Sequence, residues 1–213
     1  MRENIMTPVW TRPTLASGQL RQVLEQIYRD RPMLHFTAGQ TVPLPQDSIW
    51  VVCRGIALIT TSYESGDEAL LGLAGPSMPF GSALSWVMPY EVQALTDLDL
   101  IRLKLVEIEQ TPLLAQDLFL MLAQRHRQTE MLLSPIGQRR VEDRLRNFLQ
   151  LLGREFGQPE DQLLRLNCRL THQHLANALG TTRVTVTRLI GQFRREGWLD
   201  FDDQRHLVLK GLL

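Results

Sequence analysis

Hydrophobic residues at every second position predict a series of short β-strands between about Met33 and Leu105. The alternation is clearest on either side of Arg54-Gly55, at residues 49, 51 and 53 and again at residues 56, 58 and 60. Glu64-Ser65-Gly66-Asp67 has the composition of a hairpin turn, and Gly75-Pro76 ends the strand that follows it. Further strands are predicted over residues 92–95 and 98–105. Several short strands with regular turns indicate a small antiparallel barrel or a jelly roll, and the pattern leaves both forms open.

Spacings of three and four residues predict helices elsewhere. A short helix over residues 20–27 follows an extended lead, residues 1–18. Thr111-Pro112 opens a long helix, because proline suits the first helical position. A further amphipathic helix is predicted over residues 141–156, and Gly157-Gln158-Pro159 ends it. Residues 163–168 resemble a short strand.

The long helix carries an apolar edge with heptad spacing, which favours the packing of two such helices against each other. We therefore predict a dimer seam formed by Leu114, Leu118, Met121, Arg125, Gln128 and Leu132. The alternative is a helix packed on its own barrel, for which Phe119 and Leu122 supply a second apolar edge. A charged residue inside a seam is costly without a partner. Arg125 is therefore a candidate for binding a ligand or for fixing the register of the two helices.

Residues 170–199 have the pattern of a DNA-binding helix-turn-helix. Thr171 caps a short helix, and Gly180 ends it at a tight turn that needs a residue tolerant of positive φ. Thr181 or Thr182 caps a second helix with apolar residues at helical spacing. Residues 207–209 return after a turn beside residues 198–199, which predicts a two-stranded wing. The alternative is an ordinary helical hairpin with a basic face.

The second helix of such a motif enters the major groove of double-stranded DNA. Arginine bonds a guanine edge through two donors, and threonine methyl groups contact thymine. The two histidines of the first helix, His172 and His174, are expected near phosphates. The predicted DNA-binding residues are Thr171, His172, Thr182, Arg183, Val184, Thr185, Thr187 and Arg188.

The formal net charge of zero conceals an asymmetry along the 213 residues. Residues 1–134 carry 10 Lys and Arg against 14 Asp and Glu, whereas residues 135–213 carry 13 against 9. An acidic first part and a basic second part suit a sensor joined to a nucleic-acid reader. We predict an α+β protein with three parts: a β-barrel domain (residues 1–110), a central dimerisation helix (111–134) and a winged helix-turn-helix domain (135–213).

Cysteine usage and hydropathy bear on location. Cys53 and Cys168 form no CxxC pair, which is typical of a reduced, cytoplasmic protein. The N-terminus lacks a signal pattern, and no apolar run approaches the ~20 residues needed to span a bilayer. No membrane association is expected.

These elements together resemble the CRP/FNR family of bacterial transcription regulators, and within it the NtcA-like branch of cyanobacterial nitrogen regulators. The resemblance covers nearly the whole chain from about Leu20. Three stretches carry it, which are TRVTVTRL at 182–189, QTEM at 128–131 after Arg125, and YESGDE at 63–68. The resemblance implies a homodimer that reads a palindrome with GTA and TAC half-sites, with Arg183 and Arg188 contacting bases. It also implies nitrogen regulation as an activator that contacts RNA polymerase.

The family's effector pocket lies between the barrel and the central helix. The cAMP-binding branch needs a glutamate where this chain has Ser82, and a phosphate-pairing arginine that is absent here. A buried phosphate without a cation is costly, which disfavours cAMP. The NtcA-like branch senses 2-oxoglutarate, so the resemblance implies an effector site formed by Phe80, Gly81, Ser82, Ala83, Arg125 and Glu130.

One feature departs from the NtcA-like pattern. No arginine occurs between Arg54 and Arg102, although the branch carries one in this barrel loop. One carboxylate of a dicarboxylate ligand then lacks its clamp. Three alternatives stay open: the chain binds a different ligand, it binds 2-oxoglutarate with lower affinity, or it binds no small ligand.

Other chemistries find little support. An iron–sulfur cluster of the FNR type needs four cysteines, and no spacing around His35, Cys53 or His126 supports haem. His172 and His174 lie two apart on a helix, which does not suit a zinc site. A cupin-like enzyme needs several histidines inside the barrel, where only His35 falls, and no catalytic set is seen. An effector-independent regulator or an architectural DNA-binding protein remains as the alternative function.

Overall fold

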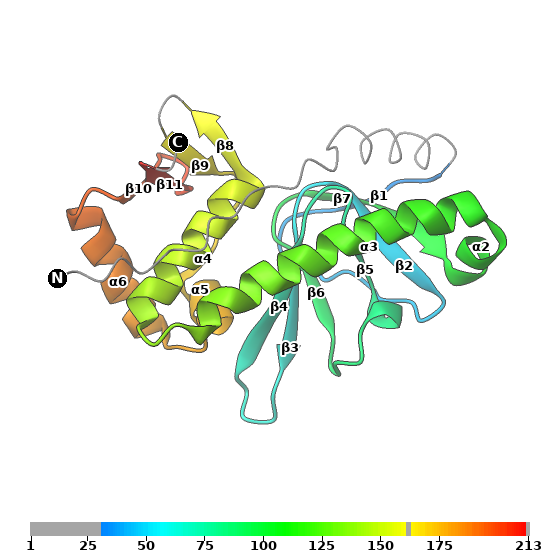
Figure 1. Ribbon diagram of the computed structural model, residues 1–213, viewed down its shortest axis with the longest axis horizontal. Coiled ribbons are helices and arrows are strands. Elements are labelled where there is room, and N and C mark those ends of the chain that lie inside the picture. The colour runs from blue at the N-terminus through cyan, green and yellow to red at the C-terminus, as the bar shows by residue number, and fades with distance from the viewer. Residues whose placement is uncertain (1–30, 161–162, 212–213) are drawn as a thin grey trace.

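A computed structural model describes residues 31–160 and 163–211 of the chain. The extended lead and the short helix predicted before residue 28 lie outside these residues. Figure 1 shows two sheets of the barrel region on one side, the C-terminal helices on the other, and the long helix α3 (Pro112–Leu133) running from one to the other. The mixed α+β architecture agrees with the prediction.

The barrel region consists of two antiparallel sheets. One has the strand order β1-β7-β2-β5 and the other β4-β3-β6. The strands are β1 (Leu34–Phe36), β2 (Ser48–Arg54), β3 (Ala57–Ser62), β4 (Glu68–Ala74), β5 (Pro79–Phe80), β6 (Glu91–Ala94) and β7 (Leu98–Lys104). Residues of both sheets, among them Trp50, Ile59 and Phe80, form one buried cluster. Burial of this apolar surface holds the two sheets together.

Strand β2 is buried on both faces, which explains its nearly continuous run of apolar residues. Trp50 and Val52 point into the barrel core, whereas Ile49 and Val51 belong to a second cluster together with Ile101. Successive side chains of a strand point to opposite faces. The second cluster therefore lies on the outside of this sheet, where α3 covers it.

The predicted dimer seam is wrong, because the edge of α3 that carries it is buried within the same chain. Leu114, Leu118 and Met121 complete the cluster on the outer face of β2 and β7. Gln128 is buried as well, with 3% of its surface exposed. The alternative, a helix packed on its own barrel, is correct, but it uses this first edge.

The second edge of α3 faces outward instead. Phe119 is 68% exposed and Leu133 is 60% exposed, whereas Leu122 is half-buried and packs against the cluster under α3. Phe119, Ala123, His126, Glu130 and Leu133 follow one another at spacings of four and three, which is a heptad edge.

The C-terminal part is a helix-turn-helix with a four-stranded sheet. The barrel region also contains two short helices, η1 (Ser82–Leu84) and α2 (Leu105–Gln110), and the turn η2 (Ser134–Gly137) follows α3. The C-terminal part then consists of α4 (Val141–Phe156), β8 (Gly157–Glu160), β9 (Leu163–Leu166), α5 (His172–Leu179), α6 (Arg183–Arg195), β10 (Leu199–Phe201) and β11 (Leu207–Lys210). The sheet order is β10-β11-β9-β8. The predicted two-stranded wing is present as β10 and β11, and it is extended by two strands.

The barrel and the C-terminal part share a hydrophobic core. Leu58 and Leu73 of the barrel lie in the same buried cluster as Leu149, Leu175 and Phe193. Cys168 belongs to this cluster, and burial raises the pKa of its thiol to about 12. A thiol with such a pKa stays protonated at neutral pH, as expected for an inert buried cysteine.

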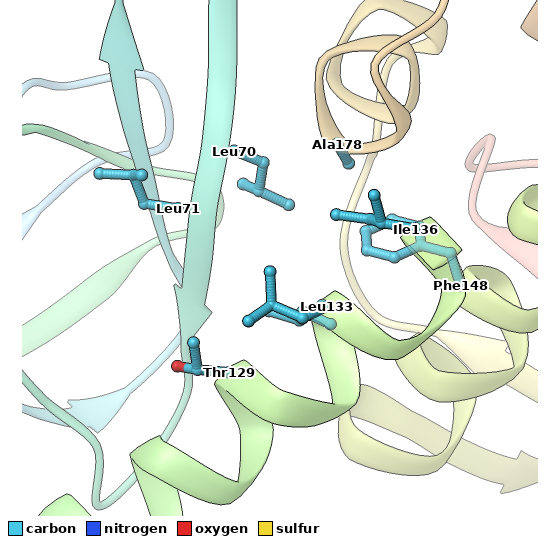
Figure 2. Close-up of a pocket in the computed structure, with 8 residues that line it drawn as sticks. Leu70, Leu71, Thr129, Leu133, Ile136, Phe148 and Ala178 are labelled. Atoms are coloured by element: carbon cyan, nitrogen blue, oxygen red, sulfur yellow. The ribbon is translucent and has the colours of Figure 1, made fainter. Parts of the chain in front are cut away.

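A small apolar pocket lies at the junction between the barrel and the C-terminal helices. Its lining comes from β4, the end of α3, η2, α4 and α5, and includes Leu70, Thr129, Ile136, Phe148 and Ala178 (Figure 2). Its volume is about 40 Å³. Pockets for small organic ligands are roughly tenfold larger, so this pocket is too small to hold such a ligand.

Candidate DNA-binding surface and effector site

Local capping positions the two helices of the helix-turn-helix. The hydroxyl of Thr171 accepts a hydrogen bond from the backbone N–H of His174 at 3.0 Å and caps α5. Gly180 follows α5 with φ of 58°, the left-handed conformation that glycine adopts without steric cost. Thr182 caps α6 by accepting from the backbone N–H of Thr185 at 3.2 Å. Both caps and the turn match the sequence prediction.

Helix α6 has a buried face and an exposed basic face. Val186, Leu189, Ile190 and Phe193 are buried at helical spacing. On the other side, Arg183, Val184, Thr187 and Arg188 are exposed, and Val184 exposes 78% of its surface. An exposed valine between two arginines is unusual for a surface that contacts only water, and it suits contact with an apolar base edge.

The arginines of this face are not bound to other side chains in the part of the chain that the structure describes. Among the described residues, Arg183 and Arg188 form no ion pair and donate no side-chain hydrogen bond. Other arginines of the same region are held in place. The guanidinium of Arg194 lies 3.1 Å from Asp200, and that of Arg165 lies 2.7 Å from Asp202 and stabilises the turn of the wing. Arg183 and Arg188 thus have donors available for DNA.

The threonines of the predicted set have two different roles. Thr182 and Thr185 bond to each other through their hydroxyls at 2.9 Å, at the cap of α6. Thr187 lies one turn further on, is exposed, and contacts His172 of α5 at 2.8 Å through its hydroxyl. Thr171, Thr182 and Thr185 therefore shape the motif, whereas His172 and Thr187 lie together on the surface beside Arg183 and Arg188.

Comparison with known proteins agrees with this geometry. Residues 143–212 match the Crp-like helix-turn-helix domain family. The chain is 36% identical to the regulatory protein CysR of Synechococcus elongatus, over 78% of this chain and 79% of the relative. It is 34% identical to the global nitrogen regulator of Synechocystis sp., over 77% of each chain. The chain belongs to the CRP/FNR family of transcription regulators.

A solved structure extends the CRP/FNR assignment to the whole fold. The CRP/FNR-family transcriptional regulator TTHA1359 of Thermus thermophilus aligns with a TM-score of 0.63 at 27% identity, over 85% of this chain and 94% of that one. These relatives are transcription regulators and not enzymes.

The structure brings several of the predicted effector residues of this CRP/FNR protein together around Arg125. Its guanidinium donates to the backbone carbonyl of Leu73 at 2.8 Å and to the side-chain oxygen of Gln128 at 3.0 Å. A further hydrogen bond joins it to the hydroxyl of Tyr90. Burial lowers the pKa of Arg125, because the charged form loses hydration. Within the described part of the chain, no carboxylate forms an ion pair with it.

Tyr90 links Arg125 to the loop after β5. Its hydroxyl also contacts the backbone of Gly81, and burial raises the pKa of that hydroxyl above its ordinary value. Phe80 is buried in the barrel core directly before this loop. Phe80, Gly81 and Arg125 are thus close to one another through Tyr90. The sequence prediction did not include Tyr90, whose contact depends on a helix 35 positions further along the chain.

Gly72 makes room for the guanidinium of Arg125. A Cβ atom built at Gly72 would lie 2.7 Å from one nitrogen of Arg125 and 2.9 Å from the other. Such distances are closer than real Cβ contacts, so any other residue at this position would displace the guanidinium. Nearby, Ser82 Oγ and Gln128 Nε2 are buried without a hydrogen-bond partner among the described residues.

Two predicted effector residues lie apart from Arg125. Glu130 is exposed and lies 3.4 Å from His126 on the outward edge of α3. Ala83 is exposed in η1. Within this chain neither reaches the guanidinium, and a role for Glu130 stays a prediction that needs a second chain.

No group of three or more His, Cys, Asp or Glu side chains that could hold a metal ion is present among the described residues. In the same part of the chain, none of the helices combines the length and apolar character needed to cross a membrane.

Proposed function

We propose that this chain is a sequence-specific regulator that reads a DNA palindrome as a homodimer. The observation that carries the proposal is the exposed face of α6, where Arg183, Arg188 and Val184 are free of other side chains within residues 31–160 and 163–211. On DNA the guanidinium groups of Arg183 and Arg188 bond to base edges, and Val184 and Thr187 contact bases or methyl groups. The similarity to global nitrogen regulators favours GTA and TAC half-sites and a role in nitrogen regulation.

The homodimer forms through the outward heptad edge of α3. Phe119 and Leu133 would be covered by the same edge of a second chain, and His126 and Glu130 lie between them. A two-fold dimer places the two reading helices roughly 34 Å apart, one turn of DNA. RNA polymerase is the further partner through which such a regulator acts on transcription.

A small anionic effector such as 2-oxoglutarate is the proposed signal. Arg125 is a buried cation surrounded by neutral acceptors, and a desolvated charge of this kind favours an anionic partner. Tyr90 connects Arg125 to the backbone of Gly81, and the neighbouring Ser82 Oγ and the Nε2 of Gln128 are buried polar atoms with no hydrogen-bond partner among the described residues. In a dimer, Glu130 of the second chain would approach the same region from α3.

A second candidate is a regulator without a small effector. It is favoured by the hydrogen bonds that Arg125 already makes to Leu73, Gln128 and Tyr90, and by the absence of a second arginine between Arg54 and Arg102. In that case these bonds hold α3 to the barrel, and the abundance of the protein controls transcription.

The test is a fluorescence-anisotropy titration on a GTA/TAC palindrome and a scrambled control at one salt concentration, with and without 2-oxoglutarate. Tighter binding to the palindrome that is enhanced by 2-oxoglutarate supports the first proposal. Specific binding without that enhancement supports the second candidate. Equal binding to both DNAs contradicts sequence-specific recognition and favours an architectural protein.

The variant Arg125→Ala separates the effector from DNA recognition. If Arg125 binds the anion, this variant loses the response to 2-oxoglutarate and keeps its basal affinity for the palindrome. A retained response would show that another residue carries the effector charge.

A further inference from the structure

The first turn of α5 and the reading face of α6 are joined by one histidine. His172 Nδ1 lies 2.8 Å from the hydroxyl oxygen of Thr187, across the turn between the two helices. The same hydroxyl donates to the backbone carbonyl of Arg183 at 2.9 Å. The three residues thus form a chain of hydrogen bonds from α5 to the first turn of α6, beside the exposed Arg183 side chain.

This chain of bonds favours one tautomer of the imidazole ring. A hydroxyl has one proton, and that of Thr187 is used toward Arg183. In the tautomer that fits this donation, the oxygen of Thr187 accepts from His172, and the proton of the neutral ring lies on Nδ1. The other ring nitrogen, Nε2, is then an acceptor, and it has no hydrogen-bond partner among the described residues.

An unprotonated Nε2 of His172 is unfavourable at the start of α5 once DNA is bound. The first helix of a helix-turn-helix crosses the DNA backbone, and residues at helix N-termini contact phosphate oxygens. His172 is the first residue of α5. A phosphate oxygen opposite Nε2 is a second acceptor, so the contact becomes favourable only when Nε2 gains a proton.

We propose that His172 positions Thr187 for base recognition and takes up a proton when the protein binds DNA, so that DNA affinity rises as the pH falls. This inference rests on the DNA-binding function proposed above. The protonated ring keeps its Nδ1–H bond to Thr187 and adds an Nε2–H bond to a phosphate. One side chain then couples the geometry of the reading helix to contact with the backbone of DNA.

The charges around His172 agree with a ring that is neutral before DNA binds. Burial and, secondly, the positive charge of Arg183 on α6 lower the pKa of His172. On β4, the charged group near α5 is Glu68, which influences His174. On α4, Arg144 bonds to the carbonyl of Leu179 at the other end of α5. Arg183 is thus the one charged group in the described residues with a resolved effect on the pKa of His172. A negatively charged phosphate has the opposite effect and raises this pKa.

The test measures the affinity of the full chain for the palindrome between about pH 6 and pH 8 at constant ionic strength, where histidine titrates. Uptake of one proton limits the change to about tenfold per pH unit. We expect the affinity to be ~3- to 10-fold higher at the acidic end. His172→Asn places an amide donor where Nδ1 lies but does not titrate, and it should lose this pH dependence. The matched control is His174→Gln, two residues along the same helix, because glutamine also suits its place in the cap of α5.

The outcomes separate this inference from the function on which it rests. Failure of the unmodified protein to prefer the palindrome contradicts the DNA-binding proposal itself. A palindrome-specific protein whose pH dependence is unchanged in His172→Asn, or lost equally in His174→Gln, overturns the role of His172. NMR of the ring nitrogens supplies a second measurement that needs no variant. An Nδ1–H ring in the free protein that becomes doubly protonated on DNA supports the proposal, and an Nε2–H ring overturns it.

Discussion

At the scale of the residue, the arginines of α6 differ in what they contact. Arg194 is bound to Asp200 and lies over the ring of Phe201, so its side chain stabilises the wing. Arg183 and Arg188 have no such contacts in the described part of the chain. The sequence alone predicts a DNA-contacting role for both arginines, because the cap and the turn glycine fix which residues begin the reading helix. Their freedom from ion pairs was visible only in the structure.

Arg183→Ala is expected to weaken binding to the palindrome by about 1–3 kcal/mol and to relax sequence preference, because a bidentate base contact is lost. The measurement is anisotropy on the palindrome and on single-base variants of each half-site. Arg195→Ala is the control, since it removes the same charge from the last turn of α6, away from the reading end. If Arg183→Ala lowers affinity on all sequences alike, as Arg195→Ala would, its contact is to phosphate and the base assignment is wrong.

At the scale of the element, α3 shows what a periodic pattern determines. The heptad spacing predicts a helix with one apolar edge, and Thr111-Pro112 predicts where this helix begins. The surface that covers this edge is not encoded in the spacing, because a β-sheet and a second helix present equally apolar surfaces. Glu130 illustrates a related limit. It lies five residues after Arg125, and a helix turns about 100° per residue, so the two side chains leave α3 on different faces.

Strand β8 and Tyr90 were missed for different physical reasons. Gly157-Gln158-Pro159 has the composition of a break, yet β8 is an edge strand, where proline is tolerated because no ladder hydrogen bond needs its missing N–H. Tyr90 has no local signal, since its hydroxyl acquires its role only when the barrel brings Gly81 and α3 together.

The contact between β4 and α3 gives a prediction for Gly72→Ala. The added methyl group meets the far end of the Arg125 side chain and not backbone, but it displaces a buried, hydrogen-bonded guanidinium, so we expect a stability loss of about 1–3 kcal/mol. The guanidinium must leave the carbonyl of Leu73, and any response of DNA binding to an anionic effector should be lost or strongly reduced. Gly137→Ala is the control, because nothing lies within 4 Å of its added Cβ. Melting curves and titrations with 2-oxoglutarate measure both effects, and a full response in Gly72→Ala would contradict this account of the site.

At the scale of the whole molecule, β4 contacts both functional regions. The Leu73 carbonyl near one end accepts from Arg125, and Glu68 at the other end accepts from the side chain of Asn177 on α5 at 3.0 Å. Leu70 packs into the shared core between them (Figure 2). The strand that holds the candidate effector residue therefore also holds the first helix of the DNA-binding motif.

We expect Asn177→Asp to loosen this contact, because a second carboxylate then faces Glu68. The loss of stability should be roughly 0.5 kcal/mol, since the pair is exposed and screened by solvent. Glu68→Gln in the same chain should restore the melting temperature by removing the repulsion. Thermal unfolding of both variants and the unmodified chain at low salt measures this. No rescue by Glu68→Gln would mean that Glu68 and Asn177 are not in contact in solution.

The outward edge of α3 determines whether two chains assemble as proposed. Phe119 is the most exposed apolar residue of this edge, and Leu133 occupies the same heptad position two heptads later. Phe119→Asp places a charge where the second helix would bury an aromatic ring, so we expect monomers at micromolar concentration and weak palindrome binding. Val106→Asp, on α2, changes an apolar residue that is 49% exposed and lies away from this edge, and it serves as the control. Sedimentation velocity distinguishes the two, and a Phe119→Asp protein that stays dimeric would move the interface to another surface. A monomer contacts only one half-site, whereas a dimer contacts both. Loss of the dimer should therefore reduce affinity for the palindrome far more than loss of either arginine alone.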